Sequence, residues 1–209
     1  MTSRGLKVAV LFFLFTGIAS VAMAASADNA TRFFIAFLEP SSDFSGDLLG
    51  TTVTVEADST IGLSWFYEYR LNPRIGLEMG IVFVEFDFDE SVAGVSGSVE
   101  LGQAFALPVT FGLDVHLLGE DSKLDLYAGP LIAYTLWGNL DFSPMAGGGM
   151  AELDDQFGLG AVVGLDVPFG AGGWQFNAAL RYLTLSAEDP SVELEIDPLN
   201  VEVGFGYRF

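Results

Sequence analysis

The sequence contains no cysteine and only one histidine among its 209 residues. Without cysteine the chain can form no disulfide, has no thiol nucleophile and offers no site for a lipoprotein anchor. One histidine is too few for a histidine-based catalytic metal centre. Stability must therefore come from something other than covalent cross-links, and we predict neither a catalytic residue nor a cofactor nor a metal site.

Basic residues are the second scarce class. Eight Lys and Arg stand against 28 Asp and Glu, which gives a net charge of −20. A chain this acidic repels nucleic-acid phosphates, so nucleic acid is excluded as a partner. At the same time 51% of the residues are hydrophobic. High charge and high hydrophobicity together conflict with an ordinary soluble domain.

Long hydrophobic runs are also missing after residue 24, where no segment reaches the 18 apolar residues of a helical membrane span. The apolar run at residues 8–19 is shorter, follows Arg4 and Lys7, and precedes Ala22-Met23-Ala24. This order is typical of a secretory signal peptide. We predict a signal peptide at residues 1–24, with Ala27 as the second cleavage choice. One domain at residues 25–209 then keeps six basic and 28 acidic residues, a net charge of −22.

What the chain does have is alternation. From residue 199 the odd positions are apolar or aromatic and the even positions are small or polar. The odd set is Leu199, Val201, Val203, Phe205, Tyr207 and Phe209, and the even set is Asn200, Glu202, Gly204, Gly206 and Arg208. A period of two indicates a β-strand. In a membrane barrel the apolar face meets lipid and charge gathers in the loops, which resolves the conflict between charge and hydrophobicity.

The same period recurs in eight segments. They are residues 31–39, 61–70, 74–83, 104–117, 123–137, 157–167, 174–184 and 199–209. Short turns at residues 71–73, 119–122 and 170–173 alternate with long connections at residues 40–59, 87–98, 141–155 and 187–197. We therefore predict an all-β fold, an eight-stranded antiparallel transmembrane β-barrel with short periplasmic turns and longer external loops. Both termini then lie in the periplasm.

Six aromatic residues share an outward face close to the predicted periplasmic turns. They are Tyr67, Tyr69, Trp174, Phe176, Tyr207 and Phe209. Aromatic rings with a polar edge favour the boundary between lipid and water. We interpret these residues as an interfacial girdle.

Four segments resemble the OmpW family of small outer-membrane proteins. The most specific is the ending, in which Asp197-Pro198 precedes a short strand that closes with Gly204-Phe205-Gly206-Tyr207-Arg208-Phe209. Residues 32–43, 106–110 and 126–130 resemble the family's first strand, its proline-bearing fourth strand and its fifth strand. Val109 stands where the fourth strand usually has a second proline, and the loops do not match. The resemblance implies passage of small hydrophobic molecules across the outer membrane of a Gram-negative bacterium.

The inward positions divide into two halves. An eight-stranded barrel is about wide enough for its side chains to fill, so an open aqueous pore is not expected. Toward the periplasmic end we predict a polar plug of Glu68, Arg70, Asp114, His116, Asp125, Arg181 and Arg208, with Glu78, Asp166, Asn177 and Glu202 on the same face. Toward the external end we predict a ligand pocket lined by Leu38, Phe66, Val82, Leu131, Trp137 and Leu183, with Val162 beside them.

Together the two halves suggest a route for a small apolar solute. The solute enters the apolar pocket from outside, is stopped by the plug and leaves sideways into the bilayer. Proline donates no hydrogen bond to a strand ladder, so Pro108 and Pro130 are the candidates for the lateral opening. A purely structural bulge at each proline fits at least as well. The expected partners are outer-membrane lipid, small apolar solutes and the barrel-assembly machinery, through the strand that ends in Phe209.

Two other functions stay open. One is a structural or adhesive barrel with a solid interior, whose acidic loops meet partners. The other is a lipid-modifying enzyme, which would need a serine or a carboxylate beside His116.

The loops carry two further ambiguities. The acidic positions Glu188, Asp189, Glu193, Glu195 and Asp197 provide oxygen ligands of the kind that calcium and magnesium bind, or else are solvated surface charge. The glycine-rich stretch 144–150 is either a lid over the pocket or a disordered loop.

Overall fold

The computed structural model describes residues 29–41, 43–48, 51–92, 97–118, 122–143, 148–170, 172–189 and 192–209. The predicted signal peptide at residues 1–24 lies outside the described residues. Within the described ranges, no helix has the length and apolar character needed to cross a membrane.

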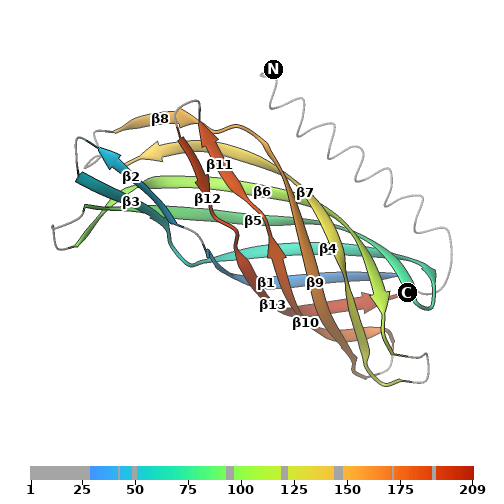
Figure 1. Cartoon of the computed structure of the whole chain (residues 1–209). Coiled ribbons are helices and arrows are strands. Elements are labelled where there is room, and N and C mark those ends of the chain that lie inside the picture. The colour runs from blue at the N-terminus through green and yellow to red at the C-terminus, as the bar shows by residue number, and fades with distance from the viewer. Residues whose placement is uncertain are drawn as a thin grey trace, which may run out of the picture.

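Eight antiparallel strands close into a barrel (Figure 1). In order around the wall they are β1 (Ala30–Glu39), β4 (Thr60–Asn72), β5 (Ile75–Val92), β6 (Ser98–His116), β7 (Asp125–Phe142), β9 (Gln156–Pro168), β10 (Trp174–Leu183) and β13 (Leu199–Arg208). The first and last of these pair with each other, from Ala30↔Arg208 to Glu39↔Leu199. The predicted eight-stranded antiparallel barrel is confirmed.

The two ends of the barrel differ. At one end, the turn end, short connections join β4 to β5, β6 to β7 and β9 to β10, and Phe209 lies there too. At the other, the loop end, the connections contain extra strands: β2 (Asp43–Leu48), β3 (Thr51–Ala57), β8 (Gly149–Glu152), β11 (Ser186–Asp189) and β12 (Val192–Glu195). β3 pairs with β5 beyond the reach of β4, and β8 pairs with β7 beyond the reach of β9.

One predicted boundary is wrong. Residues 87–98 were expected to form a connection, yet β5 and β6 stay paired as far as Ser91↔Ser98. The period of two in fact continues there, because Phe86 and Phe88 point inward while Asp87 between them points outward. The acidic content suggested a loop, whereas it marks a strand that extends past the apolar band.

The apolar outer face follows the predicted parity. On β1 the outward Phe33, Ile35 and Phe37 are exposed while Phe34 and Leu38 are buried. Near the turn end the outward rings touch one another. Ring contacts join Tyr67 to Phe209, Phe209 to Tyr207, Tyr207 to Trp174, and Phe176 to Phe205. Tyr69 packs against Tyr67 and Met79 instead.

Glycines on the inner wall make room for the large inward side chains. The ring of Phe66 lies where a side chain on Gly80 would be, within 2.0 Å of an ideal Cβ atom. The ring of Tyr127 lies over Gly164 in the same way. Such close contacts fit an interior filled by side chains, as the strand number implies.

The lipid-facing assignment predicts a depth-dependent effect of charge. Val203→Lys places an ammonium in the middle of the outward face of β13, and should destabilise the barrel by about 2–4 kcal/mol in unfolding measurements in lipid bilayers. Glu39→Lys, at the loop end of β1, is the control and should cost about 0–1 kcal/mol. Equal effects of the two substitutions would contradict the assignment.

Candidate functional site

The turn-end half of the interior is an ion-pair network, called the plug below. Its members are Arg32, Glu68, Arg70, Glu78, Asp114, His116, Asp125, Asp166, Arg181, Glu202 and Arg208. They come from all eight strands of the wall. The seven predicted plug residues are therefore brought together.

Arg32 of β1 is the centre of the plug and was missed in the sequence. Its Nη2 lies 2.9 Å from an Asp166 oxygen and pairs with Glu68, and its Nη1 lies 3.3 Å from Glu78. Its guanidinium also lies 4.4 Å from the centre of the Tyr127 ring. The signal was available, because Arg32 has the same parity as the inward residues that follow it on β1.

A second group lies nearer the turn end, around His116. Its Nδ1 is 2.7 Å from Asp125 and its Nε2 is 2.9 Å from Glu68. Asp125 also pairs with Arg70, and with Arg208 at 2.5 Å. These contacts link β4, β6, β7 and β13 across the base of the barrel.

The histidine contacts bear on the enzymatic alternative. The carboxylates that this alternative required are present beside His116, in Glu68 and Asp125. Both ring nitrogens face these carboxylates, so neither is placed to take a proton from a hydroxyl nucleophile. The same two carboxylates pair with arginines. The arrangement is that of an ion-pair network, with histidine as a bridge.

Arg181 of β10 joins the plug to the apolar half. It donates to Glu78 at 2.9 Å and to Glu202 at 3.5 Å. The other side of its guanidinium lies 3.9 Å from the centre of the Phe66 ring. A buried guanidinium stacked on an aromatic face keeps its charge while it contacts an apolar surface.

Acidic groups are in excess inside the plug, which holds six carboxylates against four arginines and one histidine. Asp114 of β6 is the least compensated. Neither of its oxygens has a hydrogen-bond partner among the described residues, and it faces Arg32 at 3.9 Å. By contrast, Asp166 accepts hydrogen bonds from Arg32, Gln175 and Asn177.

Buried apolar side chains fill the loop-end half. All six predicted pocket residues belong to one buried cluster, called the apolar cluster: Leu38, Phe66, Val82, Leu131, Trp137 and Leu183. Val162 belongs to it too, and Leu153, Leu185 and Ile196 join it from the loop-end connections. The Trp137 indole N–H donates to the carbonyl of Ser186 at 2.9 Å. The apolar cluster is thus in contact with the segments that cover the loop end.

Both candidate prolines coincide with interruptions in strand pairing. Between β5 and β6 the register breaks off at Ile81↔Val109 and resumes at Val84↔Ala106, which leaves out Pro108. Between β6 and β7 it breaks off at Gly112↔Leu131 and resumes at Val115↔Ala128, which leaves out Pro130. We call these the proline gaps. They lie on the two sides of β6.

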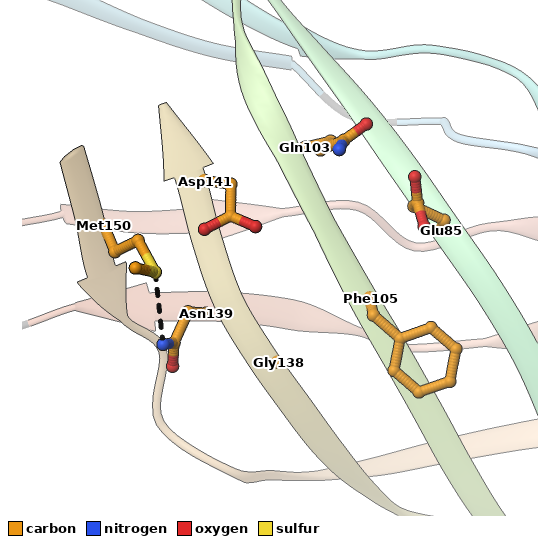
Figure 2. A pocket seen from close by; sticks show the side chains of 7 residues that line it. All are labelled: Glu85, Gln103, Phe105, Gly138, Asn139, Asp141 and Met150. Carbon is orange, nitrogen blue, oxygen red and sulfur yellow. Dashed lines mark hydrogen bonds between the residues drawn. The ribbon is translucent and has the colours of Figure 1, made fainter. Parts of the chain in front are cut away.

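A hollow of about 380 Å³ lies elsewhere, on the outer wall near the loop end (Figure 2). A bulge between β6 and β7 is located here, with Phe105 opposite Gly138 and Asn139. Figure 2 shows the carboxylate of Asp141 over this hollow, with Glu85 and Gln103 across from it. The lining side chains point away from the interior, so this hollow is distinct from the predicted pocket.

One of the acidic loop residues, Asp197, stabilises the local backbone through hydrogen bonds. The carboxylate of Asp197 accepts from the Leu185 N–H at 2.9 Å and from the Tyr182 hydroxyl at 3.2 Å, and so fixes the corner before β13. Among the described residues, no group of three or more acidic or histidine side chains could hold a metal ion. The side chains of Glu188, Asp189 and Glu193 lie outside the described residues, as does most of the predicted 144–150 lid.

The sequence model of the OmpW family matches residues 32–209. The chain belongs to the OmpW family. No curated protein matches it by sequence. Membership confirms the resemblance drawn from the terminal strand and puts the chain in the outer membrane of a Gram-negative bacterium.

Solved outer-membrane barrels have the same fold. The crystal structure of OprG from Pseudomonas aeruginosa is 25% identical, with a TM-score of 0.74 over 88% of this chain and 96% of OprG. The NMR structure of E. coli outer membrane protein W is 21% identical, with a TM-score of 0.54 over 88% and 98%. The structure of AlkL in lipid bilayers is 19% identical, with a TM-score of 0.54 over 88% and 90%. The last two support the fold of this OmpW-family chain alone.

Two carboxylates of the plug, Asp166 and Asp114, differ in the hydrogen bonds that they accept. Removing the charge of each should therefore change the stability of the barrel by different amounts. Asp166→Asn weakens hydrogen bonds from a buried arginine and should destabilise the barrel by about 3–5 kcal/mol. Asp114→Asn removes an acidic group without a hydrogen-bond partner and should leave the free energy of unfolding unchanged or raise it. Denaturant titration in lipid bilayers measures both. Greater destabilisation by Asp114→Asn than by Asp166→Asn would contradict this account of the plug.

Proposed function

We propose that this OmpW-family barrel passes small hydrophobic molecules through the apolar cluster and releases them sideways into the bilayer. The observation that carries the proposal is the division of the interior. A buried apolar cluster lies on the loop-end side and a charged network lies below it. The apolar side chains have to move apart to admit a solute; an apolar solute is then stabilised among them and has no favourable site in the charged network. Straight passage through the barrel is therefore disfavoured.

The proline gaps support the lateral step. Pro108 is buried on the inner wall opposite Thr135, and Pro130 is exposed on the outer wall opposite Ala161. Each lacks a backbone N–H, so the adjoining strand loses one ladder partner there. β6 is thus a strand of the wall whose pairing is interrupted on both sides, once next to Pro108 and once opposite Pro130. Val82 lies at the first gap and belongs to the apolar cluster.

The same proposal orients the protein. The turn end and both termini face the periplasm, the loop end faces outward, and the terminal strand with Phe209 serves as the recognition signal for barrel assembly. The asymmetry of the connections supports this orientation, since bacterial barrels have short periplasmic turns and longer external loops. Labelling of a tag inserted after Ser98, at the loop end of β6, on intact cells should detect it outside.

Passage through the interior is tested at Trp137. Trp137→Asp puts a carboxylate into the apolar cluster, and uptake of an aromatic hydrocarbon by expressing cells should fall to that of cells without the protein. Trp137→Phe keeps an apolar ring and should retain most of the uptake. Surface amounts of both variants are measured alongside. If properly inserted Trp137→Asp protein takes up the hydrocarbon normally, the structural or adhesive alternative with a solid interior is favoured.

Lateral release is tested at the prolines. Pro108→Ala and Pro130→Ala restore a backbone donor and should strengthen pairing along β6, by about 1 kcal/mol for each hydrogen bond regained. Uptake should fall in both variants as the stability of the barrel rises. Pro168→Ala, at the end of β9, is the control and should change neither. Unchanged uptake in the two stabilised variants would assign the prolines a structural role only.

A further inference from the structure

Several buried polar side-chain atoms have no hydrogen-bond partner among the described residues, and three of them belong to residues at the boundary between the plug and the apolar cluster. These three are Nη2 of Arg181, Oδ1 of Asn200 and Oγ1 of Thr110. The three residues are 0%, 2% and 1% exposed. A buried polar atom that makes no hydrogen bond destabilises the folded protein, so such an atom usually has water or a ligand as its partner.

The Phe66 ring and strand pairing connect the three residues. Phe66 contacts the guanidinium of Arg181 and also covers Gly80, whose partner on β6 is Thr110. Asn200 is the cross-strand partner of Arg181. Cross-strand partners have Cβ atoms about 4.5–5.5 Å apart. These groups therefore form the floor of the apolar cluster, at the level of Phe66.

The chemistry of the floor selects a headgroup. Arg181 offers a donor, Asn200 offers an acceptor, and the Thr110 hydroxyl can be either. A hydroxyl group satisfies both kinds, because it accepts from Arg181 while it donates to Asn200 or Thr110. A saturated hydrocarbon satisfies none of the three.

Charge excludes the commoner alternatives. A carboxylate head would approach a plug in which carboxylates already outnumber cations, with Glu78 and Glu202 bound to the same Arg181. An ammonium head could donate to Asn200 and Thr110, but it accepts no hydrogen bond and would leave Nη2 of Arg181 without a partner beside a second positive charge. A neutral hydroxyl avoids both penalties.

We propose that the cargo is an amphiphile, an aliphatic or aromatic alcohol whose hydroxyl binds Arg181, Asn200 and Thr110 while its apolar part lies in the apolar cluster. The inference rests on the proposed function and adds the substrate class. Thr110 pairs with Ala133, four residues before Trp137 on β7, so about 13 Å of strand separates the head position from the indole. An extended eight-carbon alcohol that carries a bromine at its far end is close to this length.

Two brominated probes distinguish binding of the cargo's hydroxyl group from binding of its apolar chain. Bromo-octanol and bromo-octane each carry the bromine at one chain end and differ in a hydroxyl at the other. Bromine that reaches the apolar cluster quenches Trp137 in a protein whose lipid-facing indoles are replaced, Trp65→Phe and Trp174→Phe. A variant that retains only Trp65 reports the probe concentration in the surrounding lipid. The protein is used as the full barrel in lipid bilayers.

Both probes should quench Trp137 beyond the lipid background. Thr110→Val and Asn200→Leu should each raise the bromo-octanol concentration that gives half-maximal quenching of Trp137 by about three- to tenfold. The corresponding concentration of bromo-octane should stay unchanged. Thr110→Ser, which keeps the hydroxyl, should behave as the wild type. Thr135→Val removes a buried hydroxyl that lies beside the proposed chain and not at its head, and should alter neither probe.

The possible failures are distinguishable. Quenching by neither probe would overturn the proposed function together with the inference. Quenching by both probes, with no selective loss of bromo-octanol in Thr110→Val or Asn200→Leu, would overturn the inference alone, and water would then be the partner of the three polar atoms. An equal loss of quenching by both probes in these two variants would also overturn the inference, because the hydroxyl would then have no specific binding site.

Discussion

Every backbone N–H and C=O that faces hydrocarbon has to be hydrogen-bonded within the protein, because lipid offers no partner. Closure of β1 on β13 meets this requirement for the whole wall. The other features depend on it. Eight strands fix a narrow interior, glycines such as Gly80 and Gly164 let rings lie against the wall, and little space remains for water. The charged groups that point inward can then be solvated only by one another.

The plug shows how such mutual solvation is arranged. Arg32 of β1 meets carboxylates from β4, β5 and β9, so no single hairpin could form the network alone. Buried ion pairs add little net stability, because removing two charges from water costs about as much as their attraction returns. Their contribution is to fix the register in which the strands pair. A slip by one residue would turn Arg32 toward lipid and an apolar neighbour such as Phe33 toward the plug.

Much of this could be predicted from particular residues. The alternation from Leu199 to Phe209 gave the lipid face, and the parity of Trp137 and Leu131 gave the apolar cluster. The parity of Arg32 shows that it points inward, but its central role in the plug could not be foreseen, because its partners lie 36 to 134 residues away and depend on pairing registers. The extension of β5 and β6 was missed because acidic outward residues mark a strand that extends past the lipid as readily as a loop. The unpartnered atoms of Thr110 and Asn200 depend on side-chain geometry that no sequence pattern specifies.

The pairing of β1 with β13 also has a kinetic meaning. The first barrel strand in chain order finds its second neighbour only when the last one arrives, and Asn29 and Phe209 are then joined by two backbone hydrogen bonds. Until that moment β1 presents an open edge, which is the kind of surface that aggregates. Contacts so distant in sequence form slowly. The barrel therefore needs protection during insertion until its final strand pairs with its first, which makes this closure the slow step that we expect in its assembly.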